Sequence, residues 1–204
     1  MIKVHAKFVL SAADARQFPA ASLPEIAFLG RSNVGKSSVL NSLVGEKIAR
    51  TSATPGRTRT INFFELRRQG RPEPELRFAD LPGYGYARLP REVTAEWPSF
   101  IEPYLAQRSA LALSIALVDP RAPTQESDRR LLEWLRGAGR EYLVVATKSD
   151  RLSGNELANA LRRLRTDLGT ERVLPYSAKT GSGRDELWRE IWTAASRRIA
   201  AASD

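Results

Sequence analysis

The sequence has no cysteine and only one histidine, His5. The absence of cysteine excludes disulfides, thiolate catalysis and cysteine-based metal sites, and it fits a reducing cytoplasm. A single histidine argues against a histidine-rich metal centre and against a Ser–His catalytic pair. We interpret His5 as a surface side chain.

Long apolar runs are also missing. None approaches the roughly 20 residues that a membrane helix needs. The first residues, MIKVHAKFVLSAAD, contain Lys3 and Lys7 but no apolar core of the kind found in secretory signals. We therefore expect neither a secretory signal nor a membrane partner.

The chain is long enough to enclose a sizeable core, because it has 204 residues of which 42% are hydrophobic and 27% charged. One domain over residues 1–204 is the simplest organisation. The formal net charge is +9, and such a charge attracts polyanions, with nucleic acid the commonest partner and anionic membrane the next. The alternative is that the arginines serve only solubility.

Short apolar runs alternate with segments of helical periodicity, which is typical of βαβ units in a largely parallel sheet covered on both faces. The predicted strands are 25–30, 60–67, 76–80, 110–119, 142–147 and 173–177. The polar residues 68–75 join the second strand to the third and are few enough for a hairpin, which predicts one antiparallel pair. We expect a three-layer α/β domain, with a six-stranded mixed sheet flanked by about five helices.

A phosphate-binding motif follows the first predicted strand. Residues 30–37 read GRSNVGKS and match G-x-x-x-x-G-K-[ST] in full, between an apolar strand and the helical stretch 38–44. Glycines let backbone N–H groups approach phosphates, and the helix N-terminus adds partial positive charge. Lys36 is placed to reach the β- and γ-phosphates, and the Ser37 hydroxyl to bind Mg²⁺. The predicted phosphate-binding residues are Gly30, Arg31, Ser32, Asn33, Val34, Gly35, Lys36, Ser37 and Ser38.

A second motif closes the strand 76–80. It comprises Asp80, Leu81, Pro82 and Gly83, in the pattern D-x-x-G. Alone this pattern is common in turns at the ends of strands. Downstream of a phosphate-binding loop it indicates a nucleotide-binding site. We expect Asp80 to approach the metal and the Gly83 N–H to contact the γ-phosphate.

Base recognition is predicted from two further motifs at strand ends, which comprise Thr147, Lys148, Ser149 and Asp150, and then Tyr176, Ser177, Ala178 and Lys179. The Asp150 carboxylate accepts two hydrogen bonds from guanine N1–H and the exocyclic amine, whereas adenine would leave it unpaired. Sites of this kind discriminate by about 10⁴–10⁵. The Ala178 N–H is placed to bind the guanine O6. The four motifs in this order predict GTP as the ligand.

Two residues bear on the rate of hydrolysis. Ras-like enzymes place a glutamine after D-x-x-G to orient the attacking water, and Tyr84 stands at that position here. We therefore expect slow intrinsic hydrolysis. The Asn33 carboxamide is placed to hold a monovalent cation beside the phosphates, which would stabilise the transition state. The alternative is that Asn33 simply tolerates a tight turn.

Two segments resist regular assignment, 45–59 and 83–98, and both are rich in glycine, proline or hydroxyl side chains. Long loops inside a compact domain are usually functional. Each follows a predicted phosphate-binding element, so we interpret them as the first and second switch.

These motifs together resemble the EngB-type (YihA/YsxC) bacterial GTPases of the translation-linked Era and TrmE group. The resemblance rests on PEIAFLGRSNVGKSSVLNSL at 24–43, TPGRTRTINFF at 54–64, DLPGYGYA at 80–87, TKSD and YSAK, and it covers essentially the whole chain. It implies a Ras-like fold, a cytoplasmic location, GTP hydrolysis with Mg²⁺ and a role in assembling the large ribosomal subunit. It also implies a requirement for normal cell division and septation.

The resemblance adds site residues in the first switch, which are Gly56, Arg57, Thr58, Arg59 and Thr60. It implies that Thr58 closes on Mg²⁺ beside Ser37 and Asp80, with Thr60 as the fallback for this role. The implied catalytic residues are Lys36, Thr58, Gly83 and Asn33. In this group the loop asparagine is associated with potassium activation, which favours the cation role of Asn33. The general motif N-K-x-D begins here with Thr147, so guanine affinity is expected to be modest.

Several alternatives remain open at the level of sequence. The protein is either an enzyme whose turnover times an assembly cycle or a GTP-gated RNA- or ribosome-binding module with incidental hydrolysis. A small-molecule kinase would leave TKSD and SAK without a role. The expected partners are GTP, ribosomal RNA and the large-subunit precursor, with the protein itself a monomer. The arginines of the switches are Arg50, Arg57, Arg59, Arg88 and Arg91, and a further set, Arg162, Arg163 and Arg165, is either part of an RNA surface or merely solvated.

Overall fold

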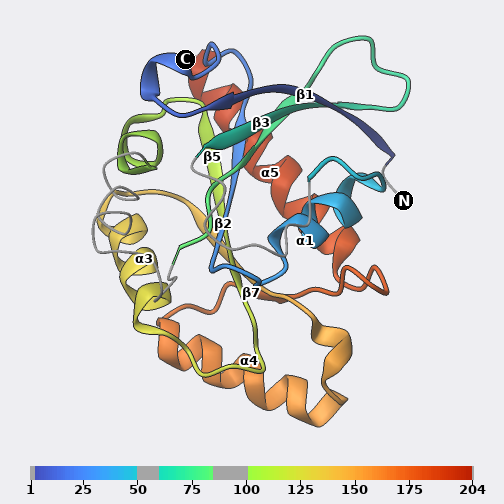
Figure 1. Ribbon diagram of the computed structural model, residues 1–204, viewed down its shortest axis with the longest axis vertical. Coiled ribbons are helices and arrows are strands. Elements are labelled where there is room, and N and C mark those ends of the chain that lie inside the picture. Colours follow the sequence, from blue (N-terminus) through green and yellow to red (C-terminus); the bar gives the residue numbers. More distant parts are fainter. Residues whose placement is uncertain (1–2, 50–59, 85–100, 204) are drawn as a thin grey trace.

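The computed structural model describes residues 3–49, 60–84 and 101–203 (Figure 1). Its strands are β1 (Val4–Ala12), β2 (Glu25–Gly30), β3 (Ile61–Arg68), β4 (Leu76–Asp80), β5 (Leu111–Val118), β6 (Tyr142–Ala146) and β7 (Val173–Pro175). Its labelled helices are α1 (Lys36–Val44), α3 (Glu126–Gly137), α4 (Gly154–Leu168) and α5 (Arg184–Ser203), and residues 101–107 are also helical. The α/β class and the flanking helices confirm the sequence-based expectation.

The strands form one sheet in the order β1-β3-β4-β2-β5-β6-β7. Strands β4, β2, β5, β6 and β7 run parallel, and β3 is antiparallel to β4, as the short connection between them predicts. The prediction of six strands is wrong by one, because β1 adds a seventh at the edge, antiparallel to β3. The predicted amino-terminal extension, 1–22, therefore contributes a strand to the sheet.

The pattern of β1 explains why sequence periodicity misses it. Phe8 pairs with Phe64, but the next pair is Leu10 with Phe63, so a bulge interrupts the register. Beyond a bulge the side chains switch faces, and the strict alternation that marks a strand is lost. The run Phe8–Leu10 therefore reads as continuous apolar sequence rather than as an alternating strand.

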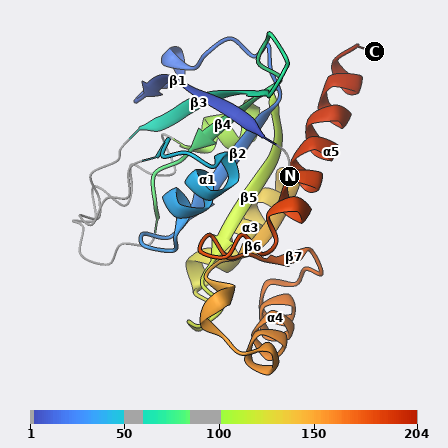
Figure 2. The ribbon, with the colours of Figure 1, turned by 90° about the vertical axis from the view of Figure 1, so that its right-hand side faces the viewer.

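Helices cover the sheet on both faces (Figures 1 and 2), and a hydrophobic layer lies on each face. Alternate residues of β2 separate them, since Ile26 and Phe28 face the layer with α1 and α5, while Ala27 and Leu29 face the other. The second layer holds α3, α4 and residues 101–107. In α5, Trp188 is fully buried in the first layer, as a core tryptophan should be. Within the described ranges no helix is both long and apolar enough to span a bilayer.

A buried polar cluster closes the amino-terminal end of β2. The Glu25 side chain, 0% exposed, accepts hydrogen bonds from Arg77 Nη1 at 2.9 Å, the Tyr104 hydroxyl at 3.0 Å and Arg108 Nε at 2.9 Å. Arg77 Nη2 also donates to Glu65 at 2.9 Å. Buried charges are tolerated only when paired and hydrogen-bonded. The cluster therefore ties residues 101–108 to the sheet at the end opposite the predicted site.

The carboxyl ends of the parallel strands meet at one edge of the sheet. The predicted motifs all follow these ends, because GRSNVGKS follows β2, DLPG closes β4, TKSD follows β6 and SAK follows β7. In open α/β sheets ligands bind in the crevice outside the carboxyl ends of the strands. The topology thus brings four segments, far apart in sequence, to one place.

Candidate functional site

The loop between β2 and α1 has a backbone that few residues other than glycine tolerate. A side chain at Gly30 would place Cβ 2.7 Å from Val34 Cγ1 and 3.2 Å from the Leu117 carbonyl oxygen. Gly35 has φ 108° and Asn33 has φ 65°, both in the left-handed region. Glycine adopts this region without strain, and asparagine tolerates it better than most residues. The motif residues are therefore required by the path of the loop.

Lys36 and Asp80 meet at the start of α1. The Lys36 ammonium group forms an ion pair with the Asp80 carboxylate, which ends β4 and is 6% exposed. Lys36 is the first residue of α1 and Ser37 the second, so both lie where the partial positive charge of the helix N-terminus acts. The loop thus gathers a cation, a carboxylate and a hydroxyl at one point.

The residues at this point fit a magnesium ion. The Ser37 hydroxyl and the Asp80 carboxylate are hard oxygen donors, which Mg²⁺ prefers. In the part of the chain that the structure describes, no group of three or more His, Cys, Asp or Glu side chains could hold a metal. A magnesium ion here would complete its shell with phosphate and water oxygens, as it usually does.

The D-x-x-G turn lies against the phosphate-binding loop. A Cβ at Gly83 would be 3.1 Å from Ser32 Oγ and 3.2 Å from Ser32 N. The Tyr84 N–H donates to the Gly30 carbonyl at 3.3 Å, and the Ser32 N–H donates to the Tyr84 carbonyl at 3.3 Å. Arg31 and Tyr84 form an isolated parallel bridge. The turn therefore continues the contact between β2 and β4 into the loop.

Thr147 and Lys148 support the loop from the other side. The Thr147 hydroxyl, buried, lies 2.7 Å from the Val34 carbonyl oxygen and donates to it. Lys148 has φ 55°, and its ammonium donates to the Asn33 carbonyl at 2.9 Å and to Asp119 Oδ2 at 3.1 Å. Burial would raise the pKa of Asp119, but hydrogen bonds from Arg121 and Lys148 outweigh it and hold that pKa well below its usual value.

Asp150 and the SAK segment are joined by a short contact. The Ser177 hydroxyl donates to Asp150 Oδ1 at 2.6 Å, and this bond lowers the pKa of Asp150. The carboxylate is ionised at neutral pH, as aspartates ordinarily are, and can accept hydrogen bonds from a ligand. Tyr176, fully buried, donates through its hydroxyl to Ser42 Oγ of α1 at 3.0 Å. Tyr176 thus positions the segment from within the core.

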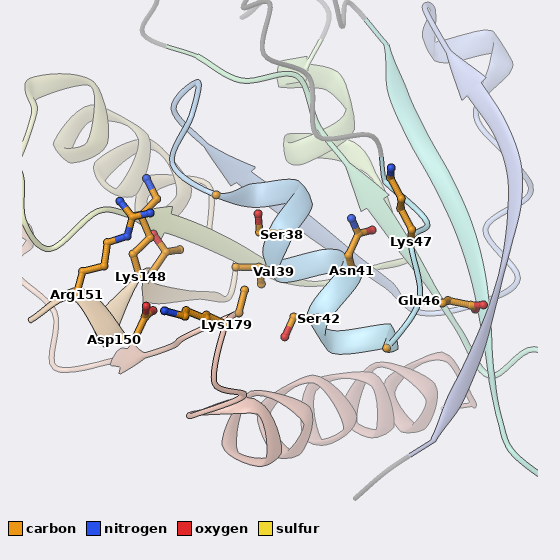
Figure 3. Close-up of a pocket in the computed structure, with 14 residues that line it drawn as sticks. Ser38, Val39, Asn41, Ser42, Glu46, Lys47, Lys148, Asp150, Arg151 and Lys179 are labelled. Atoms are coloured by element: carbon orange, nitrogen blue, oxygen red, sulfur yellow. The ribbon is translucent and has the colours of Figure 1, made fainter.

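A pocket of about 790 Å³ opens between these segments (Figure 3). Lys148, Asp150 and Lys179 gather beside α1 on one side, while Ser38 and Ser42 project from the helix (Figure 3). A volume of this order is typical of small-ligand sites. The pocket therefore has room for a nucleoside at Asp150 and leads towards the phosphate-binding loop at Gly35.

The structure describes most of the predicted site residues but not all of those in the first switch. Segments 30–38, 80–83, 147–150 and 176–179 come together at one edge of the sheet. Thr60 lies just before β3, with its hydroxyl 3.5 Å from Asn62 Oδ1. The remaining predicted residues, Gly56, Arg57, Thr58 and Arg59, lie outside the described residues, and so do Arg50, Arg88 and Arg91.

Motif reasoning misses several residues of the site. Asn41, Ser42 and Arg151 line the pocket, and Asp119 holds Lys148. Asp119 directly follows β5, so its place at a carboxyl strand end could have signalled it. Asn41 and Ser42 lie in the second half of α1, where no local pattern distinguishes them from other polar helix residues.

Asn41 organises the chain that leaves α1. Its Oδ1 accepts the Ile48 and Ala49 N–H groups at 2.9 and 2.8 Å, and its Nδ2 donates to the Ala49 carbonyl at 2.9 Å. Glu46 Oε1 accepts the Ala6 N–H of β1 at 3.1 Å. The first residues of the predicted switch, 45–49, are therefore fastened to α1 and β1.

Comparison with known proteins agrees with this geometry. A family model described as 50S ribosome-binding GTPase matches residues 25–148. The chain is 61% identical over 194 residues to the probable GTP-binding protein EngB of Koribacter versatilis, covering 95% of this chain and 96% of that protein. It is 56% identical over 191 residues to the protein of the same name from Acidobacterium capsulatum, covering 93% and 90%.

Solved structures share the fold at lower identity. A probable GTP-binding protein EngB superposes with a TM-score of 0.66 at 23% identity, covering 85% of this chain and 99% of that one. Era of Aquifex aeolicus, bound to GDP and aluminium fluoride, gives a TM-score of 0.70 at 20% identity, covering 85% and 57%. The Ras-like fold is thereby confirmed. With its loop, its strand-end motifs and relatives matched over nearly their full length, the chain belongs to the EngB family of GTP-binding proteins.

Proposed function

We propose that this protein hydrolyses GTP to GDP and phosphate with Mg²⁺ in the cytoplasm, as an assembly factor for the large ribosomal subunit. One observation supports the chemistry above all. Lys36 and Asp80 are in contact at the N-terminus of α1, beside Gly83, which lies against Ser32. This arrangement concentrates a phosphate-binding cation and a metal-binding carboxylate at one point, as phosphoryl transfer requires.

Guanine is selected by Asp150. Its carboxylate accepts a hydrogen bond from the Ser177 hydroxyl at 2.6 Å and lines the pocket together with Ala178 and Lys179. An ionised carboxylate matches the two adjacent donors of guanine and would be left unpaired by adenine. Lys148, whose side chain passes within 3.6 Å of a Cβ at Gly35, borders the same site between base and phosphates.

The phosphates are held by the loop and by α1. Backbone N–H groups of 35–37 at the helix N-terminus stabilise negative charge, and Lys36 reaches the β- and γ-phosphates. Mg²⁺, when bound through Ser37, Asp80 and Thr58, would neutralise charge on the phosphates. The Gly83 N–H contacts the γ-phosphate, and the conformation of the second switch therefore depends on whether the γ-phosphate is bound. Thr58→Ala should weaken binding of GTP more than of GDP, because the first switch closes only on GTP.

Turnover without a partner is slow. Tyr84 cannot orient water as glutamine does, and its hydroxyl is bonded to Asp128 in this structure. Potassium is proposed to stimulate the reaction through Asn33. The left-handed φ of Asn33 accounts for an asparagine in this turn, and its side chain is exposed at the surface of the loop. The turn role and the cation role are therefore compatible.

The ribosomal role rests on the family. The matching model is described as 50S ribosome-binding, and a structural neighbour, Era, has been crystallised with nucleotides of 16S ribosomal RNA. The net charge of +9 suits an RNA partner. We propose binding of ribosomal RNA or the large-subunit precursor by the GTP form, with the requirement for cell division and septation following from ribosome supply.

A second function is favoured by the position of Tyr84. A protein without a water-orienting residue could serve as a GTP-gated binding module, with hydrolysis incidental. Single-turnover GTP hydrolysis, with and without large-subunit precursor particles, separates the two. An enzyme should be stimulated by the particles, whereas a gated module should co-sediment with them in GTP at an unchanged hydrolysis rate. Failure to co-sediment in either nucleotide state would refute the ribosomal proposal.

A further inference from the structure

The residue after D-x-x-G is fastened to a helix that no nucleotide motif includes. Tyr84 is 9% exposed, and its hydroxyl donates to Asp128 Oδ1 of α3 at 3.0 Å. Asp128 is 7% exposed and lies 44 residues further along the chain. We propose that Asp128 is a positioning residue for GTP sensing, which holds Gly83 on the phosphate-binding loop through Tyr84. This inference rests on the proposed function of the site.

The backbone of Tyr84 is the first step of the argument. Its N–H donates to the Gly30 carbonyl and its carbonyl accepts from the Ser32 N–H, both at 3.3 Å. These distances are long for N–H···O bonds, whose usual range is about 2.7–3.2 Å. The backbone bridge alone is therefore a weak restraint on Gly83. A side-chain anchor at Tyr84 supplies a second restraint on the same residue.

The anchor is held mainly by the packing of its helix, because the second hydrogen bond of Asp128 is long and weak. While Oδ1 accepts from Tyr84, Oδ2 accepts from the Gln125 N–H at 3.4 Å, in the first turn of α3. The same helix buries Leu131, Leu132 and Leu135 in the core. A residue on a packed helix holds its rotamer better than one on a loop. The position of Tyr84 is thus fixed by α3 and not by its own turn alone.

The electrostatics fix the direction of the hydrogen bond, with Tyr84 as donor and Asp128 as acceptor. Burial raises the pKa of Tyr84 well above its usual value, and the charge of Asp128 raises it further, so the phenol stays protonated and donates. Burial also raises the pKa of Asp128, and the positive charge of Arg31 opposes the rise in pKa of both Tyr84 and Asp128, so this charge lies close to the pair. Arg31 belongs to the phosphate-binding loop. Three elements, the loop, the D-x-x-G turn and α3, therefore meet at this pair.

A fixed Gly83 matters only for a ligand that has a γ-phosphate. A donor held in place before the ligand binds costs no reorganisation when the contact forms. If the anchor is lost, Gly83 must be ordered on binding, and GTP loses affinity. The affinity for GDP, which has no γ-phosphate, does not change. The signature of a positioning role is therefore a change in the ratio of the two affinities.

The test compares four single variants and one double variant for binding of GDP and of a non-hydrolysable GTP analogue by calorimetry. Tyr84→Phe removes only the hydroxyl, and Asp128→Ala removes the acceptor. Asp128→Asn preserves the contact, because its carboxamide can accept from the Gln125 N–H and donate to the Tyr84 oxygen. Glu126→Ala is the matched control, since it removes an acidic side chain from the same helical turn, and this side chain pairs with the surface residues Arg129 and Arg130.

We expect Tyr84→Phe and Asp128→Ala each to weaken analogue binding about tenfold and GDP binding less than twofold. Combining the two should weaken analogue binding no more than either alone, because both remove one contact. Asp128→Asn and Glu126→Ala should bind like wild type. Because Asp128→Ala also removes a helix cap, its folding is checked by circular dichroism, and Tyr84→Phe tests the proposal with the cap intact.

The proposal is overturned if Tyr84→Phe binds the analogue as wild type does, if both nucleotides weaken equally, or if the two effects multiply in the double variant. Failure of the proposed function gives a different result. In that case the wild-type protein itself would show no preference for GTP over ATP, whatever stands at position 128.

Discussion

The hydroxyl of Thr147 donates a hydrogen bond to the carbonyl oxygen of Val34 over 2.7 Å, and so ties the base-recognition segment to the phosphate-binding loop. A second bond from the same hydroxyl reaches the Val118 carbonyl at 3.2 Å. Thr147 is 1% exposed. The general motif has asparagine here, and threonine makes the equivalent tie to the loop with a shorter side chain.

This contact predicts the effect of Thr147→Val, which keeps the shape and removes the hydroxyl. A buried carbonyl left without a partner costs about 1–3 kcal/mol. We expect a loss of about that size in the free energy of unfolding, measured by urea denaturation. GTP and GDP should lose affinity equally, because the loop holds phosphates common to both. Thr147→Ser, which keeps the hydroxyl, is the control. A selective loss of GTP alone would contradict this account of the contact.

The fold could be predicted from the sequence to the extent that its periodicity is regular. Residues 25–30 and 76–80 form β2 and β4 with the predicted bounds, and the hairpin before Leu76 gives the predicted antiparallel pair. The strand β1 was missed although Val4, Ala6 and Phe8 alternate with His5 and Lys7, because the bulge between Phe8 and Leu10 ends that alternation after five residues. Hydrophobic periodicity is the primary signal that a single sequence offers for a strand.

The site shows the same division. The loop, Asp80 and Asp150 were predictable, because their chemistry requires particular residue types at fixed places beside strand ends. Asp128 was not, because a carboxylate in the first turn of a helix is ordinary and its contact with Tyr84 spans 44 residues. Such contacts depend on how α3 packs on the sheet, and no motif spacing records that packing.

Base choice can be tested at Asp150. Asp150→Asn places an amide against the guanine amine, so one favourable contact becomes a repulsive one. We expect GTP affinity to fall at least about a hundredfold, since sites of this kind discriminate by about 10⁴–10⁵. Preference should shift towards xanthosine triphosphate, whose base carries a carbonyl where guanine has the amine. Calorimetry with GTP, ATP and xanthosine triphosphate measures this, and equal affinity of the wild type for GTP and ATP would show the assignment to be wrong.

The cation role of Asn33 is separable from its role in the turn. Asn33→Gly removes the carboxamide and accepts φ 65° without strain, whereas Asn33→Ala adds strain in the left-handed region. We expect faster steady-state hydrolysis in potassium than in sodium for the wild type, and the same rate in both salts for Asn33→Gly. The rate is measured by phosphate release at constant ionic strength. Equal rates of the wild type in the two salts would exclude the cation role and leave Asn33 with only its role in the turn.

The buried cluster around Glu25 should dominate stability at the end of the sheet remote from the site. Glu25→Ala leaves Arg77 buried at 3% exposure without this carboxylate. Breaking a buried pair by removing one partner costs about 3–5 kcal/mol. We expect such a loss in the free energy of unfolding, with nucleotide affinity little changed in the folded protein. Glu65→Ala, whose side chain is 26% exposed, should cost less. If both cost the same, burial is not what makes the cluster important.

The switch arginines are predicted to bind RNA, and α4 provides their control. Arg88 and Arg91 follow D-x-x-G, so the nucleotide state can act on them directly. In α4, by contrast, Arg163 donates to the Pro120 carbonyl at 2.7 Å and Arg165 lies 3.7 Å from Glu171, so these side chains are engaged within the chain. We expect charge reversal at Arg88 and Arg91 to weaken binding of large-subunit precursors in GTP, with GTP affinity nearly unchanged. Reversal at Arg162, which is exposed on α4, should have little effect.

The salt dependence of that binding identifies its chemistry. Each phosphate neutralised on a single strand releases counterions and contributes about −0.7 to the slope of log affinity against log salt. Reversing two arginines that contact phosphate should therefore make the slope shallower by about 1.4, whereas the Arg162 variant should keep the wild-type slope. Guanidinium groups bind phosphate through paired hydrogen bonds, so Arg→Lys at the same positions should recover the slope but only part of the affinity. Binding that ignored both salt and nucleotide would mean an apolar contact, with the switch arginines serving only solubility.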